Sequence, residues 1–298
     1  MSWQGRVLNQ VLKRTLKSIM FSSRPTPARM GMSALALELS AGIVPVPKAH
    51  FTALKAPRGE WVEADNPGKA VILYLHGGAY ISGSPRTHRP LTAELARRCK
   101  ARVLALDYRQ GPEFAFPAWM DDAVEAYRYL LAEGFEPGHI VIAGDSAGGN
   151  LTLVTLLRLR DLGLPLPAGA VCLSPWTDLA CSYQSHTLNA RHEAMLNPAG
   201  IKALGLRHIG DNDPKHPLLS PAHADLAGLP PLMVHVGTTE ILLDDARAIR
   251  RNAKRAGLRL VYREWESMPH VFPLFHLILP EGRQCIAQIA DFVQGITR

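Results

Sequence analysis

Short apolar runs alternate with longer amphipathic stretches from about residue 60 to the end of the chain. Runs rich in β-branched residues predict strands buried on both faces, and the stretches between them predict helices. Buried strands that alternate with helices form a mostly parallel sheet covered on both sides, so the pattern indicates an α/β fold. The predicted strands are 70–75, 102–106, 139–143, 169–173, 232–236 and 259–263, and the predicted helices are approximately 90–99, 119–133, 149–162, 241–257 and 281–296.

Two parts of the chain depart from this alternation. Residues 177–228 separate two predicted strands by more sequence than one crossover helix needs, and a connection this long usually forms a lid or subdomain. Residues 1–45 precede the alternation and contain two helical patterns. We expect both segments to cover the carboxyl edge of the sheet, where open α/β sheets bind ligands. The predicted organisation is cap helices at 1–45, an α/β domain at 46–179 and 217–298, and a cap insertion at 180–216.

The first helical pattern, in residues 3–20, combines an apolar stripe with basic residues. The net charge of the chain is +7, and residues 1–30 carry six Lys or Arg and no acid. We interpret the basic residues as the solvated face of a cap helix whose stripe packs on the mouth of the ligand site and on the insertion. The alternative is a contact with anionic lipid. The stripe comprises Trp3, Val7, Leu8, Val11, Leu12, Leu16, Ile19 and Met20, and the second helical pattern is Met32–Leu39.

Composition narrows the function classes. The chain is 47% hydrophobic and 20% charged, as ordinary globular domains are, and the near-neutral remainder beyond residue 30 does not suggest nucleic-acid binding. The four cysteines form no CxxC pair, so we expect reduced thiols in a cytoplasmic protein and no metal site. We also expect no cofactor, no signal peptide and no stable membrane insertion.

The segment 139–151 has the most specific pattern. An apolar strand runs into Gly144-Asp145-Ser146-Ala147-Gly148 and an apolar helix follows, which is G-x-S-x-G in a strand–turn–helix setting. The glycines allow strand and helix to approach closely, and the helix N-terminus directs amides at the reacting centre. This pattern predicts that Ser146 is a nucleophile. The alternative is a glycine-rich turn in which the serine has no catalytic role.

A second segment, His76-Gly77-Gly78-Ala79, follows the first central strand. Backbone N–H groups of such a loop can face a developing oxyanion, and each donor is typically worth ~3 kcal/mol in the transition state. We expect one further donor in the N–H of Ala147, directly after the nucleophile. The imidazole of His76 is interpreted as structural.

An acid must follow a later strand and orient the base. Glu240 lies in the loop after the strand 232–236 and is favoured, because a group that orients an imidazole needs a fixed position near the strand end. Asp244 and Asp245 are alternatives that lie one turn into the next helix. The structural interpretation of all three is that their negative charges stabilise the N-terminus of the following helix.

The base is expected in the loop after the last predicted strand. His270 lies there and is favoured, and His276 is the second candidate. His235 lies inside a strand and is interpreted as core. None of the histidines shows metal-ligand spacing.

Together these motifs resemble the hormone-sensitive-lipase-like family of bacterial esterases, which has the α/β-hydrolase fold. The resemblance implies a triad of Ser146, Glu240 and His270, a helical cap, hydrolysis of short- to medium-chain carboxylic esters and, often, a homodimer formed through the last strand. The matching pieces are His76-Gly77-Gly78-Ala79-Tyr80, Asp107-Tyr108-Arg109, Pro112-Glu113, Phe116-Pro117-Ala118, residues 144–149, Ser174-Pro175-Trp176-Thr177-Asp178-Leu179 and Met268-Pro269-His270.

The chain departs from the family pattern at three points. Ala79 stands where a third glycine is usual, so the resemblance implies oxyanion donors at Gly78 with either Gly77 or Ala79. Residues 110–114 read Gln-Gly-Pro-Glu-Phe where Leu-Ala-Pro-Glu-His is common. The acid is Glu240 where Asp is commoner. A lactone hydrolase or amidase with the same triad, or a non-catalytic receptor on the same fold, are the alternative functions.

Overall fold

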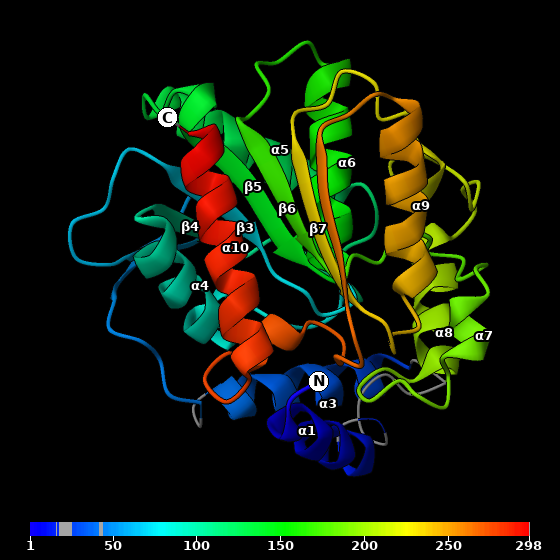
Figure 1. Cartoon of the computed structure of the whole chain (residues 1–298). Coiled ribbons are helices and arrows are strands. Elements are labelled where there is room, and N and C mark those ends of the chain that lie inside the picture. The colour runs from blue at the N-terminus through cyan, green and yellow to red at the C-terminus, as the bar shows by residue number, and fades with distance from the viewer. Residues whose placement is uncertain (16, 18–25, 42–43, 298) are drawn as a thin grey trace.

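The computed structural model describes residues 1–15, 17, 26–41 and 44–297. In this part of the chain eight strands form one sheet in the order β1-β2-β4-β3-β5-β6-β7-β8 (Figure 1). From β4 to β8 neighbouring strands are parallel, whereas β1 and β2 form an antiparallel extension that pairs with β4. The strands are β1 His50–Leu54, β2 Gly59–Glu63, β3 Val71–Leu75, β4 Arg102–Leu106, β5 Ile140–Asp145, β6 Gly169–Leu173, β7 Leu232–Gly237 and β8 Leu260–Trp265.

Helices cover both faces of the sheet, as the alternating pattern predicts (Figure 1). α4 and α10 pack on one face, and α5, α6 and α9 pack on the other. Alternate residues of β3 belong to the two hydrophobic cores, so this strand is buried from both sides. These helices are α4 Pro85–Cys99, α5 Ala118–Ala132, α6 Ala147–Asp161, α9 Leu243–Arg255 and α10 Pro280–Ile296, with short 3₁₀ turns at Pro137–His139, Pro221–His223 and Phe272–Phe275.

The remaining helices gather at the carboxyl edge of the sheet (Figure 1). Two come from the N-terminal segment, α1 Trp3–Arg14 and α3 Pro27–Ala41, and two come from the insertion, α7 Ser185–Leu188 and α8 Pro198–Ile209. Ser2 anchors α1 to α10, since its backbone N and its Oγ donate to the Glu281 carboxylate at 2.6 and 2.9 Å. None of the helices in the described ranges has the length and hydrophobicity that a membrane span requires.

The apolar stripe of α1 is only partly covered. Leu8 and Leu12 are buried, whereas the side chains of Trp3, Val7 and Val11 are 64%, 53% and 51% exposed. The expectation that the whole stripe packs against the protein is therefore wrong for these three residues. They repeat every four positions and form a second line on the solvent side of the helix. Leu16, Ile19 and Met20 lie outside the described residues.

Candidate active site

Ser146 occupies the sharp turn between β5 and α6. Its backbone is strained, at φ 53° and ψ −118°, a conformation that non-glycine residues rarely adopt. A Cβ on Gly144 would collide with the carbonyl oxygen of Gly148, and a Cβ on Gly148 would collide with that of Leu75. Glycine is required at both positions, so this turn matches the predicted one and holds Ser146 at the carboxyl edge of the sheet.

His270 and Glu240 form a buried pair. His270 Nδ1 lies 2.7 Å from Glu240 Oε2, although the two residues come from the loops after β8 and β7. Burial alone would lower the pKa of His270, but the hydrogen bond and charge of Glu240 outweigh it and raise that pKa. Burial raises the pKa of the Glu240 carboxyl. With Nδ1 engaged by the carboxylate, Nε2 is the ring nitrogen that can accept a proton.

Ser146 and His270 line the same narrow pocket. It has a volume of about 70 Å³ and is lined by Ser146, His270 and the loop 77–79. The opposite walls are apolar and come from both extra segments of the chain. They consist of Leu37 of α3 and of Met195, Leu196 and Ile201 of the insertion.

The loop 77–79 is fixed by contacts that distinguish its amides. The N–H of Gly77 donates to Asp145 Oδ1 at 3.0 Å. Gly78 has a φ of 127° and Ala79 a φ of 55°, so the chain turns sharply after Gly77. Because Asp145 engages the Gly77 amide, the geometry favours Gly78 and Ala79 over Gly77 as oxyanion donors.

Asp145 is the centre of a buried polar cluster under this loop. Tyr74 donates to its Oδ1 at 2.7 Å, and His88 Nε2 lies 3.3 Å from the same oxygen. Burial opposes a charged His88, but the Asp145 carboxylate outweighs it and raises the His88 pKa. His76 stacks on Tyr108 with ring centroids 4.4 Å apart, and burial lowers its pKa to about 3. A neutral, stacked His76 fits the structural role assigned to it.

Known proteins share both the sequence and the fold. Residues 72–274 match the family model described as the alpha/beta hydrolase fold. The chain belongs to this family. It is 46% identical to an acetyl-hydrolase of Streptomyces hygroscopicus over 86% of each protein, and 37% identical to an esterase of Acinetobacter venetianus over 82% of this chain and 80% of that protein.

Solved structures agree with this assignment. A crystal structure of an esterase from the bacterial hormone-sensitive lipase family superposes with a TM-score of 0.91 at 40% identity, covering all of this chain and 99% of the other. The resemblance to that family and the predicted α/β-hydrolase fold are thereby confirmed.

The alternative acids and base of this hydrolase are engaged elsewhere. Asp245 accepts the backbone N–H groups of Thr177 and Asp178, both at 2.8 Å. Asp244 accepts the N–H of Ser185 and forms an ion pair with Arg247. His276 Nδ1 lies 3.1 Å from the carbonyl oxygen of Pro273. Of the three candidate carboxylates, Glu240 is the one bonded to His270.

Two residues near the candidate site were not predicted from the sequence. Ser174 Oγ donates to Glu240 Oε1 at 2.7 Å and accepts the N–H of Val271 at 3.0 Å. His208 of α8 places its Nε2 2.8 Å from the carbonyl oxygen of Ala79, and burial lowers its pKa to about 4. Ser174 could have been suspected because it follows a predicted strand, as Ser146, Glu240 and His270 do. For His208 the sequence holds no local signal.

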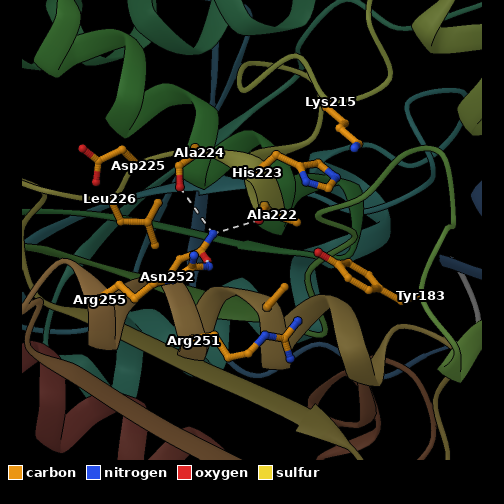
Figure 2. A pocket seen from close by; sticks show the side chains of 11 residues that line it. Tyr183, Lys215, Ala222, His223, Ala224, Asp225, Leu226, Arg251, Asn252 and Arg255 are labelled. Atoms are coloured by element: carbon orange, nitrogen blue, oxygen red, sulfur yellow. Dashed lines mark hydrogen bonds between the residues drawn. The ribbon is translucent and has the colours of Figure 1, made fainter.

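The hydrolase also has a basic cavity, which the distribution of charge along the sequence did not predict. This cavity has a volume of about 650 Å³ and shares no lining residue with the Ser146 pocket. Figure 2 shows Tyr183, Lys215, His223 and Arg251 around it. Its basic character belongs to a larger cluster, because residues 246–263 contain seven Lys or Arg and no acid. The positive charge is therefore not confined to the N-terminal segment. The cluster comprises Arg247, Arg250, Arg251, Lys254, Arg255, Arg259 and Arg263.

Within the described ranges, no group of three or more His, Cys, Asp or Glu side chains is arranged to hold a metal ion.

Proposed function

We propose that this α/β-hydrolase is a serine carboxylesterase in which Ser146 is the nucleophile, His270 the base and Glu240 the orienting acid. The contact that carries the proposal is the 2.7 Å hydrogen bond between His270 and Glu240, beside a strained Ser146 in the same pocket. A nucleophile, a base and a group that orients the base are the three parts that acyl transfer requires. The names of the relatives, esterase and acetyl-hydrolase, agree with this activity.

The mechanism follows from these positions. Ser146 Oγ attacks the ester carbonyl carbon while its proton passes to His270 Nε2. The carbonyl oxygen becomes an oxyanion, for which Gly78, Ala79 and Ala147 are the proposed N–H donors. The carbon–oxygen bond to the alcohol then breaks and His270 protonates the leaving oxygen. Water, deprotonated by His270, attacks the acyl-enzyme, which releases the acid and regenerates Ser146.

The pocket supports short acyl chains as the preferred substrates. Its volume of about 70 Å³ is small, and its walls are mostly apolar; on the same measure a site for one water needs ~10–15 Å³. The apolar side chains that close it, Leu37 and Leu196, belong to the segments 1–45 and 180–216 that we propose as the cap. An acetyl or other short acyl group fits such a space, and hydrolysis of lactones or amides uses the same triad.

Replacement of the nucleophile tests this function. Ser146→Ala should lower the kcat/KM for p-nitrophenyl acetate by ~10⁴-fold or more, with the folded state intact. A panel of p-nitrophenyl esters from acetate to palmitate, assayed beside lactones and anilides, defines the substrate class. Turnover near the wild-type rate in Ser146→Ala, or inertness of the wild type toward the whole panel, would contradict the proposal.

We further propose a cytoplasmic protein that can form a homodimer through β8. β8 is the last strand in the order of the sheet and pairs with β7, which supports this edge as the dimer interface. The four cysteines are all buried and unpaired, as expected in a reducing compartment.

A further inference from the structure

Glu193 is a buried carboxylate that lies outside the triad. It belongs to the insertion between α7 and α8 and is 1% exposed. Its Oε1 accepts the backbone N–H groups of Met195 and Leu196 at 2.8 and 3.2 Å, and its Oε2 accepts the N–H of Ile241 at 3.0 Å. Met195 and Leu196 line the Ser146 pocket, and Ile241 directly follows Glu240. One side chain therefore joins the pocket wall to the loop that carries the acid.

Neighbouring contacts strengthen this junction. Asn189 Nδ2 donates to the carbonyl oxygens of Thr238 and Glu240 at 3.1 and 2.7 Å, so the insertion holds the loop 238–241 at a second point. Lys17 Nζ donates to the carbonyl oxygens of Ala190 and Glu193 at 2.7 and 3.0 Å. The N-terminal segment, the insertion and the acid loop thus meet around Glu193.

We propose that Glu193 is a positioning residue, which holds the loop of Glu240 in place against the pocket wall and so couples the substrate pocket to the triad. The inference rests on the proposed function, because it assigns Glu193 a role in orienting Glu240. Glu193 also places a carboxylate close enough to the buried pair to act on His270.

That charge reaches His270. The charged groups that face His270 are Glu240 from the β7–α9 loop, Glu193 from the insertion and Asp145 from β5, while His88 of α4 lines the same pocket. Each of the three carboxylates raises the pKa of His270, against the burial that lowers it. Activity requires neutral His270 and rises with pH through its titration. Removal of the Glu193 charge should therefore lower the His270 pKa and move that rise to lower pH.

Glu193→Gln tests the proposal, because glutamine has nearly the same shape. Its amide oxygen can still accept from Met195 and Leu196, but its NH₂ group then faces the N–H of Ile241, and the link to the acid loop is lost. We expect kcat/KM for p-nitrophenyl acetate at the high-pH plateau to fall roughly tenfold. We also expect the midpoint of the acid limb of the kcat/KM profile to move down by roughly half a pH unit.

Two matched variants separate charge from shape. Glu193→Asp keeps the charge but shortens the side chain, so its plateau should fall while its midpoint stays at the wild-type pH. Asp211→Asn removes an exposed charge from the same insertion and should change neither quantity. A wild-type plateau and midpoint in Glu193→Gln would overturn the proposal, and so would a lower plateau with an unshifted midpoint.

The same measurements distinguish a failure of this inference from a failure of the proposed function. If Ser146→Ala abolishes turnover while Glu193→Gln matches the wild type, only the role of Glu193 is wrong. If Ser146→Ala retains turnover, the triad itself is wrong. Should Glu193→Gln not fold, Glu193→Asp decides the question, because a wild-type plateau in that variant would overturn the proposal.

Discussion

At the scale of single residues, the site depends on a chain of buried hydrogen bonds behind His270. Glu240 Oε2 faces His270, and Glu240 Oε1 accepts from Ser174 Oγ and from the N–H of Gly237 at 2.5 Å. Ser174 in turn accepts the N–H of Val271, the residue after His270. The serine hydroxyl therefore contacts the acid and the base loop at once and fixes their relative position.

Ser174→Ala should weaken both catalysis and folding. The substitution leaves the buried N–H of Val271 without its acceptor, which costs ~1–3 kcal/mol of unfolding free energy. Without the hydrogen bond from Ser174, Glu240 holds His270 less firmly. The kcat/KM for p-nitrophenyl acetate should therefore fall roughly tenfold. Urea unfolding and initial rates measure the two effects.

An exposed serine serves as the control for this substitution. Ser182→Ala lies a few residues further along the chain, at the surface, and should leave the rate unchanged. A wild-type kcat/KM in Ser174→Ala would show that the hydroxyl does not position the acid.

The sequence predicts some of these residues and not others, for a physical reason. Ser146 is recognisable because its turn requires glycines two residues before and after it, so the constraint is local. Glu240 and His270 follow predicted strands, and strand ends converge at one edge of a parallel sheet. Ser174 and Glu193 act across 66 and 48 residues of chain, and no spacing rule encodes such contacts.

At the scale of elements, the loops after β5, β7 and β8 hold Ser146, Glu240 and His270, whereas Leu37 of α3 and Met195, Leu196 and Ile201 of the insertion line the opposite wall of the pocket. The central strands could be predicted because they are continuous apolar runs buried on both faces. β1 and β2 were missed because polar residues interrupt them and β1 is largely exposed at the sheet edge. The bounds of the cap helices depend on tertiary contacts, which periodicity alone does not give.

The pocket wall supplied by the insertion should set the acyl-chain preference. Leu196→Ala removes a buried side chain from the pocket and leaves space for additional methylene groups. The ratio of kcat/KM for p-nitrophenyl octanoate to that for the acetate should rise roughly tenfold. Rates for the two esters, measured on variants shown to be folded, test this expectation.

The control for the pocket wall lies in the same insertion. Leu188→Ala changes a leucine that is 69% exposed, and it should leave the ratio unaltered. An unchanged ratio in Leu196→Ala would mean that the acyl chain lies elsewhere.

At the scale of the whole molecule, buried neutral histidines should make stability depend on pH. Burial lowers the pKa of His76 and His235 to about 3 and that of His208 to about 4, from an ordinary value of 6.5. His235 Nδ1 accepts a hydrogen bond from Trp265 Nε1, which only an unprotonated nitrogen can do. Between pH 6.5 and 4 these residues are neutral when folded and protonated when unfolded.

The sign of the effect follows directly. The unfolded state binds more protons in this range, so the unfolding free energy falls as pH decreases, by ~1.4 kcal/mol per pH unit for each fully titrating histidine. His88 and His270 have raised pKa values in the folded protein. Their contribution to the unfolding free energy is therefore present below pH 6.5, and it is lost only as pH rises through their folded-state pKa values. Urea unfolding at pH 7, 6 and 5 should show that the unfolding free energy decreases as the pH falls.

One histidine can be removed to check the assignment. His208→Gln retains an N–H donor for the carbonyl oxygen of Ala79 without a group that titrates, so its stability should depend less steeply on pH. Equal slopes for the variant and the wild type would contradict the assignment of His208 as a buried neutral group.

The anchoring of α1 also has a consequence for the order in which the protein is completed. Ser2 binds Glu281, and Asn9 Nδ2 donates to the carbonyl oxygen of Ser267, so α1 contacts partners 279 and 258 residues further along the chain. At about 5–20 residues per second, a ribosome needs roughly 13–53 s to supply those partners after it has made α1. During that time Leu8 and Leu12, the buried leucines of α1, lack these partners. The buried face of α1 thus stays uncovered until the segment 267–281 has been made.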